Sequence, residues 1–275
     1  MKYQNIGGVA TLVQHRGATT LPGHPPDCGL GSVVVCLHDA GGNGNGFADL
    51  MDALAATQSP IAFDLPGHGR SGGLDALDSI GAMAAHAAGL LDAFGIGSVA
   101  LVGEGMGGAV AIELALARPD LASALVLVGG PAISFAFDTE IASLSAITSG
   151  RARREFDRSG YAPDTDRAVY QKAFAEWVKT DPRATLGDRK AQAAWTLGSR
   201  GEAISAPVLV VVGEHEEAAS VAAATELVAQ LGSASIDTLS GAGRRGGVEQ
   251  PAALAARIAS FLEGARGQRS RETPP

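Results

Sequence analysis

A short apolar run that ends in glycines and passes directly into a helical pattern constrains this chain most. It lies at residues 98 to 108, SVALVGEGMGG, where Val99 to Val102 form the apolar run. The pattern predicts a buried strand, a tight turn and a helix. A strand followed at once by a helix is the repeating unit of α/β proteins, so this stretch predicts an α/β fold.

Strand and helix patterns alternate along the chain on both sides of this stretch. Apolar strands are expected at residues 33–37, 60–63, 124–128 and 207–212. Helices are expected at residues 80–94, 107–117, 221–231 and 252–262. The strands are apolar on both faces, as a sheet covered by crossover helices requires. We therefore expect a mostly parallel central sheet with flanking helices.

The sequence changes in character between Pro131 and about Pro207. Runs of β-branched residues give way to charged, helix-forming segments, which hold both tryptophans. We expect residues 131–206 to form a helical cap inserted into a core made of residues 1–130 and 207–265. The polar tail at residues 266–275 is expected to be disordered.

Charge and composition exclude several classes of partner and indicate a cellular location. The chain has 29 acidic and 21 basic residues and a formal charge of −8, which argues against a nucleic-acid partner. No stretch approaches the roughly 20 apolar residues of a membrane span, so we expect no membrane partner and a cytoplasmic location. Cys28 and Cys36 show neither metal spacing nor a disulfide framework and are expected to be free thiols.

Four sequence features follow one another in the order seen in the α/β-hydrolase superfamily, which the chain resembles. They are LHDAGG, DLPGHGRSGG, GEGMGG, and GEHEE with GAGRRGGVEQP. GEGMGG matches the G-x-S-x-G nucleophile elbow of that superfamily, including the further glycine that usually follows it. The resemblance implies an α/β-hydrolase fold with an inserted helical cap.

The same resemblance implies a degenerate catalytic triad. It places the serine position at Gly105, the histidine position at Arg244 and the acid position at Glu216. Glycine has no side chain that could attack a substrate, and arginine cannot act as a general base because it stays protonated. The resemblance therefore implies that the Ser–His dyad is missing.

The oxyanion hole of this superfamily uses backbone N–H groups, which here would belong to Ala40 and Met106. Both donors are expected to survive the loss of the triad. The usual His-Gly of the first turn is His38-Asp39 in this chain, and a negative charge there would oppose an oxyanion. Gly105 is expected either to relieve the strained turn or to leave a vacated pocket floor for water or a substrate atom.

Several side chains are candidates for acid–base chemistry or ligand binding. Glu104 leads because it is the only carboxylate inside the elbow, and a buried carboxyl with a raised pKa can transfer protons. The alternative is that Glu104 is bound to nearby backbone. Arg244 is expected to pair with Glu216 or to face an anionic ligand group. Further candidates are His38, Asp39 and His215.

A dinucleotide site is a competing interpretation, because Gly103, Gly105 and Gly108 also satisfy G-x-G-x-x-G after a strand. Such a site requires an acidic residue at the end of the next strand, for the ribose. That strand ends instead in Gly129 and Gly130. We therefore expect no cofactor and no metal.

Two functions are compatible with these features. The first is an enzyme that acts without a covalent serine step, as a lyase, cyclase, dehydratase or water-mediated hydrolase, on a small apolar carbonyl compound. The second is a non-catalytic binding or regulatory protein. The His-Asp turn and the glycine-only elbow resemble the N-myc downstream-regulated family and support the second function. The expected ligand is a small apolar, carbonyl or carboxylate molecule, and the sequence leaves a homodimer open.

Overall fold

The computed structural model describes residues 1–21, 24–129 and 137–272. Within these residues, eight strands form one sheet in the order β1-β2-β4-β3-β5-β6-β7-β8. The strands are β1 (Lys2–Ile6), β2 (Val9–His15), β3 (Val33–Leu37), β4 (Ser59–Phe63), β5 (Val99–Glu104), β6 (Ala122–Val128), β7 (Val208–Gly213) and β8 (Ala234–Leu239). Strand β2 pairs antiparallel with β1 and β4, and all other neighbours pair parallel. The predicted mostly parallel α/β fold is confirmed.

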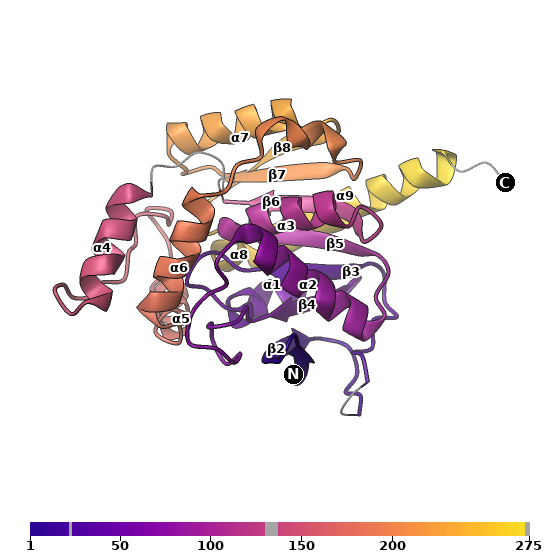
Figure 1. Cartoon of the computed structure of the whole chain (residues 1–275). Helices are drawn as coiled ribbons and strands as arrows, with labels where there is room; N and C mark the ends of the chain where they lie inside the picture. Colours follow the sequence, from indigo (N-terminus) through magenta and orange to yellow (C-terminus); the bar gives the residue numbers. More distant parts are fainter. Residues whose placement is uncertain (22–23, 130–136, 273–275) are drawn as a thin grey trace.

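Helices cover both faces of this sheet (Figure 1). One face packs against helices α2 (Ile80–Phe94), α3 (Met106–Ala117) and α7 (Ala218–Gln230). The other packs against the turn η1 (Gly44–Phe47) and helices α1 (Ala48–Leu54) and α9 (Pro251–Glu272), next to the short α8 (Gly246–Glu249). Two hydrophobic cores result.

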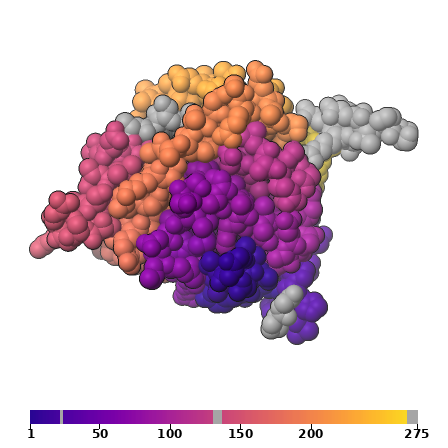
Figure 2. Space-filling model, in the orientation of Figure 1, coloured from indigo at the N-terminus to yellow at the C-terminus, as the bar shows by residue number. Residues whose placement is uncertain are grey.

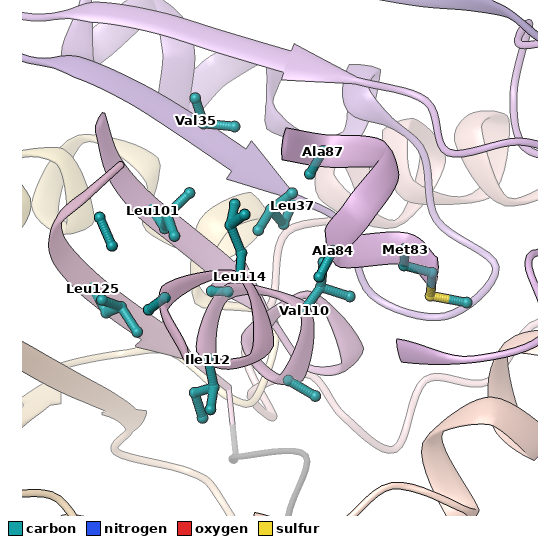
Figure 3. Close-up of a cluster of buried hydrophobic side chains, with 14 of the residues drawn as sticks. Val35, Leu37, Met83, Ala84, Ala87, Leu101, Val110, Ile112, Leu114 and Leu125 are labelled. Atoms are coloured by element: carbon teal, nitrogen blue, oxygen red, sulfur yellow. The ribbon is translucent and has the colours of Figure 1, made fainter. Parts of the chain in front are cut away.

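Strand β3 shows how the sequence builds the two cores. Val35 and Leu37 join the core beneath α2 and α3, whereas Val34 and Cys36 join the core beneath α1 and α9. Successive strand residues point to opposite faces, so an unbroken apolar strand serves both cores. Figure 3 shows Leu37 among the side chains of the first core. Cys28 and Cys36 are both free, as predicted.

Between β6 and β7 the described residues form a group of helices at one end of the sheet (Figure 1). They are α4 (Asp138–Thr148), α5 (Arg167–Trp177), α6 (Pro182–Ala193) and the turn η2 (Gly198–Ala203). This is the stretch predicted to form the cap, and we call it the cap below. Its predicted start at residue 131 lies outside the described residues. Figure 2 shows the orange surface of α6 directly against the purple segment that follows β4.

The sequence prediction matches the boundaries of β3 and α2 and misplaces the end of α9. Helix α9 continues to Glu272, so the expected disordered tail is wrong as far as that residue. The segment after residue 262 contains three arginines and no proline before 274, and the helix continues through Gly264 and Gly267. None of the helices in the described part of the chain combines the length and the apolar character that crossing a membrane requires.

Candidate functional site

The turn between β5 and α3 has the backbone of a nucleophile elbow. Gly105 adopts φ 54° and ψ −115°, a conformation that glycine reaches without the steric cost paid by other residues. Helix α3 begins at the next residue and approaches β3 so closely that a β-carbon on Gly107 would lie 2.0 Å from the carbonyl oxygen of Leu37. The predicted strand, turn and helix are therefore present, with glycine at the apex.

The carboxylate of Asp39 fills the space above this apex. A β-carbon on Gly105 would lie 2.3 Å from Oδ1 of Asp39, well inside van der Waals contact. The same Oδ1 accepts a hydrogen bond from the backbone N–H of Met106 at 2.9 Å. The expectation of a vacated pocket floor is therefore wrong, and so is that of a free Met106 donor. A side chain of the first turn occupies both.

Two arginines hold Asp39 in this position. Arg245 lies 3.0 Å from Oδ2 of Asp39, and Arg189 lies 3.4 Å from Oδ1. Burial by itself would raise the pKa of Asp39, which is only 7% exposed, but the charges of Arg189 and Arg245 outweigh burial and hold the pKa well below its usual range. Asp39 is thus ionised and bound on both oxygens.

This ion pair also joins the cap to the core. Arg189 belongs to α6, donates to Oε1 of Gln192 at 2.6 Å, and lies 2.9 Å from Oε1 of Glu140 in α4. Two cap helices are therefore linked through one guanidinium to the first turn of the core. The sequence analysis missed Arg189, which lies 150 positions from Asp39. It also missed Arg245, whose only signal was its place beside Arg244.

A second buried charge pair lies next to the first. Nε2 of His68 donates to Oδ2 of Asp188 at 2.7 Å, and both side chains are fully buried. Asp188 also accepts from the N–H of Gly41 at 2.8 Å. Burial alone would lower the pKa of His68, but the charge and hydrogen bond of Asp188 raise it above its ordinary value. The pair fastens α6 to the loop after β4 and to the first turn.

His38 is neutral and has no free nitrogen. Its Nε2 accepts from the N–H of Leu65 at 3.2 Å, and its Nδ1 lies 2.9 Å from the carbonyl oxygen of Asp39, to which it donates. Burial lowers the pKa of His38 to about 4, and the neighbouring His68 adds to this shift. An imidazole engaged at both nitrogens is a structural part of the turn, and it is poorly placed to take a substrate proton.

Glu104 ends β5 immediately before the elbow. Its Oε1 is buried and has no hydrogen-bond partner in the described part of the protein. Burial raises the pKa of Glu104 to about 7; Arg245 and Arg244 oppose this shift, whereas Asp39 and Glu249 add to it. The result is a carboxyl group that gains and loses a proton near neutral pH.

A cavity of about 340 Å³ opens beside Glu104, between the first turn, η1 and helix α5 of the cap. The wall includes the aromatic side chains Phe47, Phe156, Tyr161 and Trp177. Of the predicted site residues, His38, Asp39, Ala40 and Glu104 line this cavity. Gly105 and Met106 are absent from its described lining, because Asp39 lies over them.

Three predicted site residues lie elsewhere. Oε1 of Glu216 accepts from the N–H of Gly213 at 2.8 Å, and the carboxylate binds back onto its own turn. Arg244 forms no ion pair with Glu216: its N–H donates to the carbonyl oxygen of Gly160 at 2.8 Å, and its guanidinium packs against the same residue. The predicted Arg244–Glu216 pair is therefore wrong. His215 is exposed and outside the described cavity wall.

The described residues contain no group of three or more His, Cys, Asp or Glu side chains placed to share a metal ion.

Comparison with known proteins identifies the family. A model of the alpha/beta hydrolase family matches residues 34–257, and the chain belongs to this family. Among curated relatives, a 2-hydroxy-6-oxononadienedioate/2-hydroxy-6-oxononatrienedioate hydrolase of Dechloromonas aromatica is 36% identical over 113 residues, 39% of each chain. A lipase of Mycobacterium tuberculosis is 40% identical over 127 residues, 45% of this chain and 43% of the relative. The matches thus span about two fifths of the length of these relatives.

Solved structures agree on the fold over nearly the whole chain. A thermophilic esterase of Thermogutta terrifontis superposes with a TM-score of 0.82 at 18% identity, covering 96% of this chain and 99% of the esterase. The enol-lactonase of Burkholderia xenovorans superposes with a TM-score of 0.78 at 20% identity, covering 95% and 99% of the two chains. The fold is therefore that of the alpha/beta hydrolases.

Proposed function

We propose that this chain is an alpha/beta hydrolase-family enzyme that works without a covalent serine step and uses Glu104 to transfer protons on a small apolar carbonyl compound. The observation that supports this most directly is Glu104, which lines the cavity, has a buried Oε1 without a hydrogen-bond partner in the described part of the protein, and has its pKa raised to about 7. A general base or acid is most effective when its pKa lies near the working pH. The Dechloromonas relative is named for an oxo compound, which supports a carbonyl ligand.

The position of Asp39 favours proton transfer over hydrolysis. Hydrolysis would generate an oxyanion, and the N–H of Met106 that would stabilise it is bound to Asp39. Proton transfer next to a carbonyl group leaves an enolate, whose oxygen also needs a donor; without a nucleophile at the elbow that oxygen need not lie at Met106, and the N–H of Ala40 in the cavity wall would serve. The Glu104 carboxylate would remove a proton from the carbon next to a carbonyl group, and the protonated Glu104 would return that proton to another atom of the same ligand. A lyase, cyclase or dehydratase proceeds through such steps.

One specific observation favours the second candidate, a non-catalytic binding protein. Neither of the two groups that the family uses for chemistry at the elbow is available: Gly105 stands at the serine position, and the N–H of Met106 is bound by the chain itself. In this case the cavity would hold a ligand without changing it.

Exchange of carbon-bound protons separates the two candidates. Benzylacetone and other small aromatic ketones would be incubated with the protein in deuterium oxide, and NMR would follow deuterium uptake next to the carbonyl group. We expect uptake faster than in buffer for the parent protein. We expect loss of uptake with binding retained for Glu104→Gln, which keeps the shape and removes the titration. Binding without any exchange by the parent protein would contradict proton transfer and support the binding protein.

A further inference from the structure

The carboxylate of Asp39 occupies a complete carboxylate-binding site. One of its oxygens accepts from the N–H of Met106, at the N-terminus of α3, and its two oxygens face Arg189 and Arg245. A helix N-terminus and guanidinium groups are the partners that proteins use for carboxylate ligands. In this protein the site is filled from within, so an incoming carboxylate would have to displace Asp39.

The other charged groups of the cavity wall are also paired. Nζ of Lys172 lies 2.7 Å from Oδ2 of Asp49. Glu176 accepts from Nζ of Lys179 at 2.6 Å and from Nδ2 of Asn45 at 2.7 Å. Every cation in the described cavity wall therefore already has a carboxylate partner.

Glu104 is the remaining charged residue of the described wall, and it also favours neutral ligands over carboxylates. When protonated, its carboxyl group can donate a hydrogen bond to a neutral carbonyl or amide oxygen. When ionised, it repels a carboxylate. Burial of an anion without a counter-charge is strongly unfavourable, whereas the aromatic wall favours an apolar body.

We infer that the cavity selects uncharged aromatic or apolar ligands, and that Asp39 is the specificity residue that excludes carboxylates. The inference deepens the proposed function by naming its ligand class, and it rests on the cavity beside Glu104 being the ligand site. It does not depend on any reaction there. The sequence analysis expected an apolar, carbonyl or carboxylate ligand; the inference retains the neutral carbonyl compound as a ligand and excludes the carboxylate.

Three probes of nearly identical shape test this inference: benzylacetone, phenylpropanamide and phenylpropanoate. Calorimetry would measure their affinities at a pH below 7, where Glu104 is largely protonated and its charge contributes little to the discrimination. We expect both neutral probes to bind the parent protein at least about tenfold more tightly than phenylpropanoate. Equal or tighter binding of phenylpropanoate would overturn the inference. Failure of both neutral probes to bind would also overturn it.

Asp39→Asn tests the assignment to that residue. The amide keeps the shape and frees Arg245, so we expect the affinity for phenylpropanoate to rise about tenfold and that for benzylacetone to change less than about twofold. Asp52→Asn is the matched control: it breaks an exposed pair with Arg16 outside the described cavity wall and should change the affinity for either probe by less than about twofold.

A folded Asp39→Asn variant that binds phenylpropanoate no better than the parent would refute the role of Asp39. If the variant does not fold, the affinities of the three probes for the parent still decide the ligand class. If the inference holds, the Glu104→Gln variant should still bind the neutral probes more tightly than phenylpropanoate, even if it catalyses no deuterium exchange. Failure of proton transfer is therefore distinguishable from failure of the inference.

Discussion

Oδ1 of Asp39 accepts a hydrogen bond from the backbone N–H of Met106 over 2.9 Å, so a carboxylate of the chain itself binds the amide that follows the elbow apex. This contact depends on three residues acting together. Gly105 leaves room for the carboxylate, Asp39 supplies it, and Arg245 neutralises its charge. The elbow backbone is retained, and the donor that follows its apex is bound by the chain itself.

The protein should not react with serine-directed fluorophosphonate probes or hydrolyse short nitrophenyl esters. Gly105 offers no hydroxyl group, and the adjacent donor is occupied by Asp39. Intact-mass spectrometry after probe treatment would measure the labelling. Stoichiometric labelling of a residue in the cavity would show instead that another side chain acts as a nucleophile.

Restoring the serine and histidine alone should not restore esterase activity. A β-carbon at position 105 would meet Oδ1 of Asp39 at 2.3 Å, so Gly105→Ser with Arg244→His should remain inert to probe and ester. Adding Asp39→Gly removes the obstruction and frees the Met106 donor.

We expect the triple variant to show slow esterase activity and probe labelling, because nucleophile, base and oxyanion donor act as a unit. The double variant is its matched control. Activity of the double variant equal to that of the triple variant would show that Asp39 is not the obstruction.

The buried His68–Asp188 pair should make stability depend on pH. The folded-state pKa of His68 is raised above its unfolded value, so the stabilisation is complete below about pH 6.5 and is lost as the pH rises through the raised pKa. Asp188→Ala should cost roughly 3–5 kcal/mol of unfolding free energy below pH 6.5, because it leaves a buried charge unpaired.

Urea unfolding at several pH values would measure both effects. Asp49→Ala, which breaks the exposed pair with Lys172, is the control and should change the unfolding free energy by less than about 1 kcal/mol. An equal cost for the two substitutions at low pH would argue against a buried charged pair.

Glu104→Gln should stabilise the protein above pH 7. The pKa of Glu104 is raised to about 7 in the folded state, so the folded state binds more protons than the unfolded state at intermediate pH. The stability of the parent should therefore fall as the pH rises from its unfolded pKa towards 7. Above pH 7 the variant should be more stable by roughly 3 kcal/mol, because it carries no buried charge.

Thermal or urea unfolding from pH 4 to pH 8 would compare the two proteins. Parallel stability curves for parent and variant would contradict the raised pKa of Glu104, and with it the proposed proton transfer.

Local patterns in the sequence were sufficient for the elements of the core. The apolar run at Val33–Leu37 becomes β3, and the helical pattern at Ile80–Phe94 becomes α2 with Gly95 at its end. The glycines around Gly105 predicted a strand, a turn and a helix, and Glu104 was singled out because it precedes that turn. These features depend on backbone preferences and periodic burial, which act between residues close in the chain.

The partners of the charged side chains were decided only by the tertiary structure. Arg189 and Asp188 come from α6 of the cap, and they reach Asp39 and His68 because the cap packs on the first turn and on the loop after β4. Arg245, and not its neighbour Arg244, pairs with Asp39, because the two side chains leave the backbone in different directions. The spacing of residues along the sequence predicts neither how the cap packs on the core nor the directions of these two side chains. The sequence alone therefore determined the fold and the glycine at position 105, whereas the tertiary structure determined that the carboxylate of Asp39 lies over that glycine.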